Sequence, residues 1–259
     1  MVIAMSCTEN WYHYLMVDIY SLITTTKNIK KIYLLLSTSD SKQIPYLDDI
    51  MNKYKVEIIL VNIKDFLEEK INKITFNGNT PYTSFCFSKI LLSNFVREDK
   101  VLYIDTDAIV RKDISNVWKY DISNYYVAGV KDIGIEERGN LDELNYSGKY
   151  INSGFVLFNL KKIREDGIED KWFDVISNRK LRFPDQDAIN LVCANKILYL
   201  PQMYNVCYGV TQYIANYDLA KVFHFAGIKE DWVVNFYMSE EWYDAEEKFY
   251  NEFGWKKNK

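Results

Sequence analysis

Apolar runs of strand character alternate with helix-like stretches through the first half of the chain. The pattern predicts strands over Val2–Cys7, Ile32–Leu36, Glu57–Val61 and Val101–Ile104, and helices over Trp11–Thr26, Ser41–Tyr54 and Ser84–Val96. Strands separated by helices imply right-handed crossovers and a mostly parallel sheet, in which ligands bind beyond the carboxyl ends of the strands. The predicted fold class is therefore α/β, with helices flanking a mostly parallel sheet.

The second half of the chain has a more mixed pattern. It predicts strands over Tyr125–Val130, Phe155–Leu160 and Val222–Phe225, and helices over Asp170–Asn178, Asp187–Ala194 and Glu240–Phe253. The polar stretch Asp132–Lys149 is interpreted as a surface excursion. The turn-rich stretch Asn72–Ser84 either closes over a ligand or simply connects two elements. Since no linker or internal repeat interrupts the pattern, we predict a single domain.

Two aspartates follow the apolar run Val101–Ile104, and a second apolar run comes after them. Asp105 and Asp107 stand two residues apart, and strand side chains at such positions point the same way. Converging carboxylates at a buried strand end are costly unless a cation lies between them. Mn²⁺ or Mg²⁺ suits oxygen ligands and usually accompanies phosphate. The pair therefore predicts a phosphorylated substrate, although Asp-x-Asp pairs more often cap turns or face solvent.

A histidine and two lysines add cationic or metal-binding groups to this picture. His224 ends a short apolar run close to Gly227 and Lys229. A neutral imidazole is a suitable third ligand for Mn²⁺, and a lysine can meet phosphate as a point charge. Lys89 lies on the predicted helix before the aspartates, where solvent exposure is the alternative to a role in the site.

Two polar segments of the second half also qualify as site candidates. Asn152-Ser153-Gly154 precedes a predicted strand, where it either lets a ligand approach the backbone or forms a turn. Pro184-Asp185-Gln186-Asp187 opens a predicted helix. Capping of free amides would explain a carboxylate there, but it does not explain Gln186.

The order of these segments resembles glycosyltransferase family 8, the group that contains glycogenin and bacterial lipopolysaccharide galactosyl- and glucosyltransferases. The similarity covers roughly residues 1–232, and its motifs are Phe87–Ile90, Tyr103–Asp107, Asn152–Leu160, Pro184–Asn190 and His224–Gly227. The resemblance implies a GT-A fold, a Rossmann-like domain with a mixed, mostly parallel sheet. It also implies retaining transfer of a hexose, glucose or galactose, from a UDP-sugar to a saccharide acceptor with Mn²⁺. Residues 1–232 would form the catalytic domain, and 233–259 a helical extension packed on it.

The resemblance also assigns roles to individual residues. Asp105, Asp107 and His224 would hold the metal. The residues near the nucleotide, diphosphate or donor sugar would be Cys7, Thr8, Asn10, Lys89, Thr106, Asp132, Asn152, Gly227 and Lys229. Gln186 and Asp185 would be the catalytic residues, with Gln186 beneath the anomeric carbon. Lys229 comes one position earlier than the lysine of the family, which leaves its contact with the diphosphate open. Gln186 is a poor nucleophile, so we favour attack on the same face of the sugar over a covalent intermediate.

Two other functions remain as alternatives. An apolar strand followed by Asp-x-Asp also resembles phosphatases of the haloacid dehalogenase type, in which the first aspartate attacks phosphorus. That motif normally ends the first strand of its domain, whereas about a hundred residues precede Asp105. An inactive module that binds nucleotide sugars is the second alternative.

The amino-acid composition limits which partners the protein can bind and in which cellular compartment it works. A net charge of −4 and a pI of about 5.4 argue against a broad nucleic-acid surface. The four cysteines are scattered, which fits reduced thiols in a cytoplasmic protein. No stretch approaches 18 apolar residues, and no signal peptide is predicted. The terminal helix has an apolar face that predicts core packing, with peripheral contact at the inner face of a membrane as the alternative.

Overall fold

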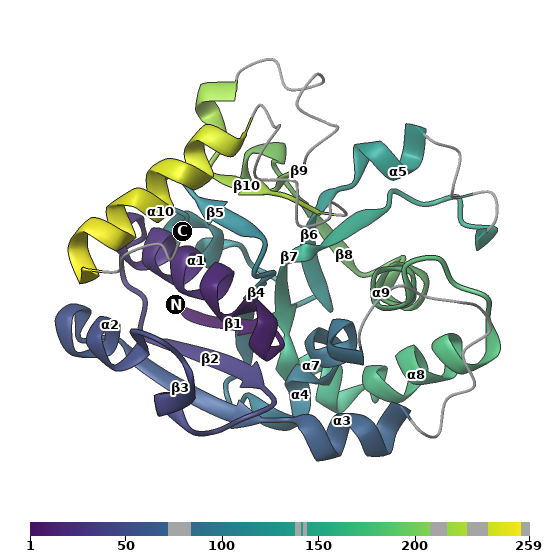
Figure 1. Cartoon of the computed structure of the whole chain (residues 1–259). Helices are drawn as coiled ribbons and strands as arrows, with labels where there is room; N and C mark the ends of the chain where they lie inside the picture. The colour runs from purple at the N-terminus through teal and green to yellow at the C-terminus, as the bar shows by residue number, and fades with distance from the viewer. Residues whose placement is uncertain (72–83, 138–140, 142–143, 208–216, 227–237, 255–259) are drawn as a thin grey trace.

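A computed structural model describes residues 1–71, 84–137, 141, 144–207, 217–226 and 238–254 (Figure 1). Its central sheet has seven strands in the order β3-β2-β1-β4-β7-β6-β8. These are β1 (Val2–Ser6), β2 (Lys31–Leu36), β3 (Glu57–Asn62), β4 (Lys100–Ile104), β6 (Val127–Lys131), β7 (Ile151–Asn159) and β8 (Ile197–Leu200). All neighbouring pairs are parallel except the two that β7 makes with β4 and β6. The mostly parallel mixed sheet predicted from the sequence is thus confirmed.

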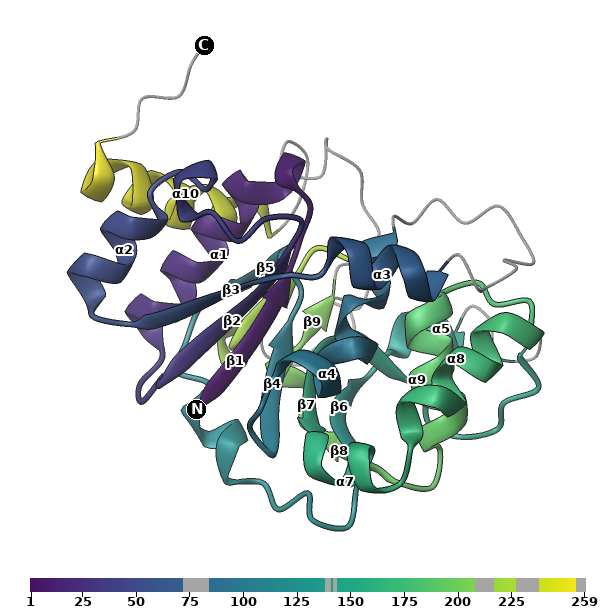
Figure 2. The same cartoon turned by 90° about the horizontal axis from the view of Figure 1, so that it is seen from below.

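Helices cover both faces of this sheet, as the view in Figure 2 shows. One face carries α1 (Tyr12–Thr25), α2 (Leu47–Tyr54) and α10 (Ser239–Phe253). The other face carries α3 (Lys64–Ile71), α4 (Leu92–Phe95), α7 (Leu160–Glu165), α8 (Ile168–Asn178) and α9 (Pro184–Cys193). Because both faces are covered, the inner strands are mostly apolar, and every residue of β1 is buried.

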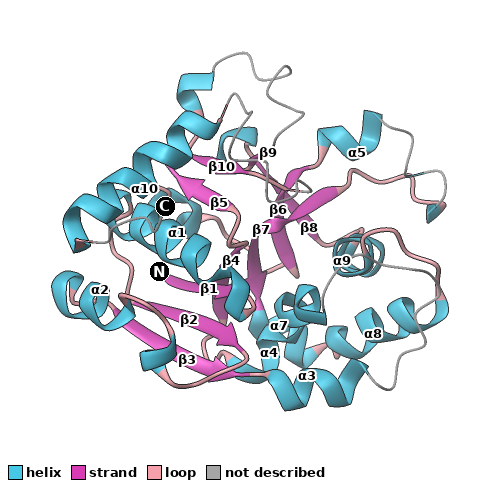
Figure 3. Cartoon of the chain, viewed as in Figure 1, coloured by secondary structure: helices cyan, strands magenta, loops and turns pink. Residues whose placement is uncertain are grey.

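A second, three-stranded sheet follows the carboxyl end of β4 (Figure 3). It consists of β5 (Ala108–Val110), β9 (Val206–Cys207) and β10 (Val222–His224). Strand β10 pairs with β5 in antiparallel register, and His224 stands opposite Ala108. This pairing places the histidine beside Asp107, more than a hundred residues earlier in the chain.

Several predicted elements have different bounds in the structure. The helix predicted over Ser41–Tyr54 is a 3-10 turn at Ser41–Gln43 followed by α2, because Pro45 disfavours helical backbone at the residue before it. The segment Ser84–Val96 is a 3-10 helix over Ser84–Leu91 that continues into α4. The excursion Asp132–Lys149 contains the short helix α5 (Ile133–Glu137). The predicted loop 72–83 lies outside the described residues.

The terminal helix α10 lies along α1 in the figure and in its contacts. Trp242 is buried, and its ring lies 5.4 Å from that of Tyr14 and 6.0 Å from that of Phe225. Phe249 is likewise buried, 5.6 Å from the Tyr20 ring. The apolar face of α10 is therefore part of the core. Among the described residues, no helix is both long and apolar enough to cross a membrane.

Candidate functional site

The candidate residues gather at one edge of the central sheet. Strands β1, β4 and β6 end at this edge, and Cys7, Asp105 and Asp132 are the first residues after these three strands. Strand β7 runs the opposite way and begins at the same edge, which brings Asn152 and its neighbours to the others. Asn152-Ser153-Gly154 was predicted to precede the strand, but the structure places it inside β7. The strand extends further because Ile151 pairs with Lys131 of β6, and Gly154 O accepts from the backbone N–H of Asp105 just after β4.

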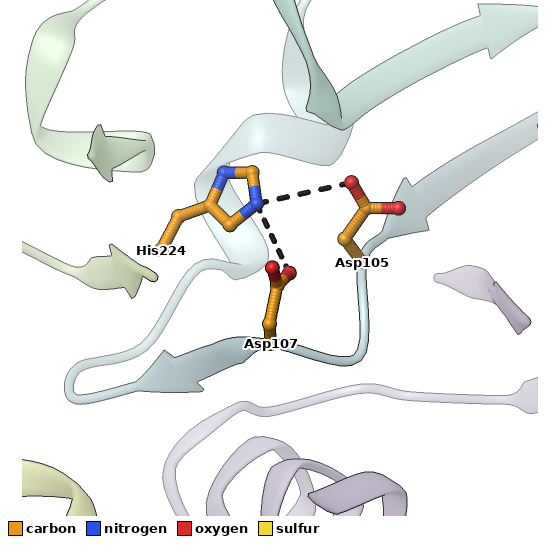
Figure 4. A group of neighbouring side chains, drawn as sticks. All are labelled: Asp105, Asp107 and His224. Atoms are coloured by element: carbon orange, nitrogen blue, oxygen red, sulfur yellow. Dashed lines mark ion pairs between the residues drawn. The ribbon is translucent and has the colours of Figure 1, made fainter. Parts of the chain in front are cut away.

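Asp105, Asp107 and His224 form a group that we call the cation centre (Figure 4). One side-chain oxygen or nitrogen from each residue lies within 4.8 Å of those from the other two. His224 Nε2 lies 3.8 Å from Asp105 Oδ2 and 3.1 Å from Asp107 Oδ1. Despite this short distance, Asp107 Oδ1 is a buried atom without an aligned hydrogen-bond partner among the described residues. Carboxylate oxygens and an imidazole nitrogen that converge in this way suit a shared cation, and two carboxylates with one imidazole fit Mn²⁺.

Gly154 makes this convergence possible. A Cβ atom at this position would lie 2.1 Å from His224 Cε1 and 2.8 Å from Asp105 Oδ2, far inside contact distance. The sequence predicted that this glycine allows a ligand to approach the backbone. The structure shows that the side chains of the cation centre themselves fill the space above it.

Electrostatics couple the imidazole to the carboxylate of Asp107. Burial by itself lowers the pKa of His224, but the Asp107 carboxylate outweighs burial and raises that pKa well above its usual value. Burial likewise tends to raise the pKa of Asp107, and the imidazole outweighs it and lowers that pKa. His224 Nδ1 lies 3.1 Å from Asn205 Oδ1, an acceptor that directs the Nδ1 proton away from the aspartates. The Nε2 atom is thereby directed toward the centre.

Lys89 sits beside the cation centre within a second group of polar side chains, which we call the Lys89 network. Its Nζ lies 2.9 Å from Asp105 Oδ1 and 3.2 Å from Asp185 Oδ2. Nζ also donates to Ser153 Oγ at 3.2 Å, and that hydroxyl donates to Asp185 at 2.9 Å. Burial alone lowers the pKa of Lys89, but Asp105 and Asp185 outweigh it and raise the pKa well above its usual value. Lys89 is thus a buried ammonium, and the alternative of an exposed helix lysine is wrong.

Gln186 extends the Lys89 network toward Asp132. Its Oε1 accepts from the backbone N–H of Ser153 at 2.9 Å, and its Nε2 donates to Asp132 Oδ2 at 3.2 Å. Asn152 Nδ2 donates to the same Asp132 oxygen at 3.2 Å. The amide of Gln186 is therefore held in one orientation from both ends.

Three residues of the site were given no role from the sequence. Ser153 joins Lys89 to Asp185, as described. Asn205 donates to Asn152 Oδ1 at 2.8 Å and faces His224, which connects the network to the cation centre. Cys207 Sγ lies 3.6 Å from His224 Nδ1. Asn205 and Cys207 stand in a segment without a recognisable motif, so only the pairing of β9 with β10 reveals them.

The remaining predicted residues lie farther along the same edge. Cys7 is buried, Thr8 is partly exposed and Asn10 is exposed, all just after β1. Thr106 is buried between the two aspartates. Gly227 and Lys229 lie outside the described residues.

The amino-acid sequence of the chain is similar to those of known proteins. The model of the family described as glycosyl transferase family 8 matches residues 2–233. A lipopolysaccharide 1,2-glucosyltransferase of Escherichia coli is 24% identical over 243 residues, covering 86% of this chain and 70% of the relative. A Haemophilus influenzae relative is 25% identical over 215 residues, which cover 79% of this chain and only 63% of that protein. The chain thus spans less than two thirds of that relative.

Solved structures show the same architecture. The galactosyltransferase LgtC in complex with donor and acceptor sugar analogues superposes with a TM-score of 0.78 at 18% identity, over 96% of both chains. The glycosyltransferase GlyE of Streptococcus pneumoniae gives a TM-score of 0.71 at 20% identity, over 98% of this chain and 62% of that one. These likenesses confirm the predicted GT-A type of fold.

Proposed function

The chain belongs to glycosyltransferase family 8, and we propose that it transfers a hexose, glucose or galactose, from a UDP-sugar to a saccharide acceptor with retention of configuration. The observation that carries the proposal is the convergence of Asp105, Asp107 and His224 at the carboxyl edge of the sheet. That edge is where α/β folds bind nucleotides. The relative named as a lipopolysaccharide 1,2-glucosyltransferase supports a role in lipopolysaccharide or capsule synthesis.

Mn²⁺ is the proposed cation, with Mg²⁺ as the alternative. Two carboxylates and a buried imidazole would hold it, and the nitrogen ligand favours Mn²⁺ over Mg²⁺. When bound, such an ion offsets the negative charge that develops on a departing diphosphate. Lys89, buried and charged between Asp105 and Asp185, would supply a further positive charge at the same edge.

Gln186 and Asp185 are the proposed catalytic residues. Asp185 is already engaged by Lys89 and by the Ser153 hydroxyl, which reduces its strength as a nucleophile. Gln186 carries a neutral amide that is fixed at both ends. Neither group is suited to forming a covalent sugar intermediate, which supports attack of the acceptor on the same face as the departing diphosphate. The leaving phosphate would then accept the proton of the acceptor hydroxyl.

The other residues around the edge are assigned by position. Cys7, Thr8 and Asn10 follow β1 and would face the base and ribose. Asp132, Asn152 and Thr106 lie at the same edge and would meet the sugar or the diphosphate. Gly227 and Lys229 are proposed to meet the diphosphate from the family resemblance alone. We further propose residues 1–232 as the catalytic unit and 233–259 as an extension packed on it. The free cysteines are consistent with a cytoplasmic location, and peripheral membrane contact through the terminal segment is the alternative.

The deciding experiment measures UDP release from a panel of UDP-sugars with Mn²⁺, with and without EDTA. We expect one UDP-hexose to be preferred, and EDTA to abolish its turnover. Stereochemistry of the product, followed by NMR, distinguishes retention from inversion. Metal-dependent UDP binding without turnover of any donor would favour the inactive module. Hydrolysis of p-nitrophenyl phosphate that is lost in Asp105→Asn would favour the phosphatase.

A further inference from the structure

Helix α9 carries a buried amide that the proposed reaction does not use. Asn190 lies inside this helix and is fully buried. Its neighbours Ala188 and Ile189 belong to the apolar core on the same face of the sheet. Asparagine is a poor helix former, and burying its amide costs free energy unless the amide is hydrogen-bonded. Packing and helix preference both favour an apolar residue here, so the amide needs another reason.

Three hydrogen bonds engage this amide. Asn190 Oδ1 accepts from the backbone N–H of Ile151 at 2.7 Å, and Nδ2 donates to the carbonyl oxygen of Ile151 at 2.8 Å. Nδ2 also donates to the carbonyl oxygen of Gln186, one turn earlier in α9, at 2.9 Å. An amide matches the donor and the acceptor of Ile151 together, whereas a carboxylate or an apolar side chain does not. Asn190 thus joins the helix to the first residue of β7.

The sheet leaves the backbone of Ile151 open on the side that Asn190 occupies. The carbonyl oxygen of Tyr150 accepts from Asp132 N at 2.8 Å, so it points toward the β6 side of the strand. Backbone groups of successive residues in an antiparallel strand point to alternate sides, so those of Ile151 point toward the β4 side. Strand β4 ends opposite Phe155, before it reaches this position. Asn190 therefore makes the bonds that a neighbouring strand would otherwise make.

The same contacts enclose Gln186 in a ring. Its carbonyl oxygen is bonded to Asn190, which in turn holds Ile151. Two residues further along β7, the backbone N–H of Ser153 donates to Gln186 Oε1 at 2.9 Å. The main chain and the side chain of Gln186 are thereby both tied to β7. Opening this ring at Asn190 would free the first turn of α9, which also carries Asp185, to move relative to the strand.

We propose that Asn190 is a positioning residue, which fixes Gln186 and Asp185 against β7 at the distance that sugar transfer requires. The inference rests on the proposed function, in which these two residues are the catalytic ones. Displacement of a catalytic group by about 1 Å can slow a reaction about 100-fold. Loss of Asn190 should therefore lower kcat. Binding of UDP with Mn²⁺ should not change, because the residues of the cation centre belong to other elements.

The test compares the full-length chain with two variants. Asn190→Ala removes all three hydrogen bonds. Asn190→Ser keeps a hydroxyl that can bond the carbonyl oxygen of Gln186 within the helix, but it is too short to reach Ile151. We expect kcat for the preferred UDP-sugar to fall about 10- to 100-fold in both variants, with unchanged affinity for UDP and Mn²⁺ in calorimetry. Both should stay folded, because Tyr150 also attaches α9 by donating to Asp187 Oδ1 at 2.5 Å.

Hydrogen exchange of the Ser153 amide, followed by NMR, provides a readout besides activity. This amide is bonded to Gln186 Oε1, so its exchange reports whether the Gln186 side chain stays in place. We expect it to exchange several-fold faster in both Asn190 variants than in the natural chain.

Asn159→Ala is the matched control. Asn159 stands at the other end of β7 and anchors helix α7 there: its Nδ2 donates to two backbone carbonyl oxygens, and its Oδ1 accepts from Lys162 N at 3.0 Å. This variant also loses three hydrogen bonds between β7 and its surroundings, but far from Gln186. It should lose stability without a change in kcat or in exchange at Ser153.

Unchanged kcat in both Asn190 variants, or an equal loss of kcat in Asn159→Ala, would overturn the inference. A natural chain that turns over no UDP-sugar would instead refute the proposed function. In that case exchange at Ser153 still tests the anchor, and an unchanged rate in the Asn190 variants would show that Asn190 does not hold Gln186.

Discussion

The cation centre and the Lys89 network meet at the first residues of β7, yet they accommodate buried negative charge differently. In the network, an ammonium lies within 3.2 Å of Asp105 and Asp185, and the remaining polar atoms bond one another. In the centre, two carboxylates face one imidazole, and Asp107 Oδ1 has no aligned hydrogen-bond partner among the described residues. The polar atoms of the network satisfy one another, whereas the proposed cation would complete the centre. Under the proposed function, the network would orient the sugar and the centre would hold the cation against the diphosphate.

Gly154→Ala should have the largest effect, because the added Cβ would meet two of the three side chains of the centre, His224 and Asp105. The added Cβ would overlap His224 Cε1 at 2.1 Å, and backbone inside a central strand cannot give way. We expect Mn²⁺ affinity to fall by more than about 100-fold, beyond the effect of losing a supporting residue. Calorimetry with Mn²⁺ measures this directly.

Gly129→Ala is the control for that variant. Its Cβ would meet the end of the Ile151 side chain at 2.6 Å, in the same sheet but away from the centre. Both variants should lose stability, and only Gly154→Ala should lose the metal. If Gly154→Ala bound Mn²⁺ as the natural chain does, the three side chains would not form the site.

The sequence predicted the aspartates of the centre but not the reason for their geometry. Asp105 and Asp107 were found because they follow a recognisable apolar strand, although both lie in the turn between β4 and β5 and not, as the alternation argument assumed, in the strand itself. His224 was proposed as a third ligand from the chemistry of its imidazole and from family resemblance, because the pairing of β10 with β5 is a contact between distant segments that no local pattern predicts.

Contacts between distant segments also explain why some bounds of the predicted strands were wrong. Parallel strands β1 to β4 were predicted within a residue or two, because nearly continuous apolar runs between helices mark them. The start of β7 was missed because Asn152, Ser153 and Gly154 are polar or small. They lie in the strand through hydrogen bonds with Gln186, Asn152 and the backbone N–H of Asp105, not through their own strand preference.

Replacing the buried ammonium of Lys89 should mainly lower the free energy of unfolding, whereas Gly154→Ala should mainly lower the affinity for Mn²⁺. Lys89→Met leaves Asp105 and Asp185 without their cation, and breaking a buried ion pair in this way costs about 3–5 kcal/mol. Asp107→Asn should change the free energy of unfolding much less while abolishing Mn²⁺ binding. Urea unfolding in EDTA compares the two variants. Equal losses in the free energy of unfolding would show that the network and the centre do not contribute independently to stability.

The pH dependence of stability should distinguish the two groups further. Since the folded protein raises the pKa of His224, the His224–Asp107 pair stabilises it fully below about pH 6.5, and this contribution is lost as pH rises through the raised pKa. The metal-free protein should therefore lose on the order of 1 kcal/mol on the alkaline side. Mn²⁺ affinity should increase over the same range, because the metal needs the neutral imidazole. His224→Gln should flatten the stability profile measured in EDTA, and a profile unchanged by that variant would contradict the coupling.

Ser153→Ala should have the smallest effect, since the network retains its main contacts without the hydroxyl. Lys89 still reaches Asp185 at 3.2 Å, and the backbone N–H of residue 153 still holds Gln186. We expect a loss of about 1 kcal/mol in the free energy of unfolding, the value of one hydrogen-bonding group. A several-fold fall in kcat with unchanged Mn²⁺ affinity should accompany it.

Ser177→Ala is the control, because it removes a hydroxyl bonded to Phe173 O on α8. We expect a similar loss in the free energy of unfolding but no effect on kcat. A fall in Mn²⁺ affinity in Ser153→Ala would mean that the network supports the cation centre as well as the sugar.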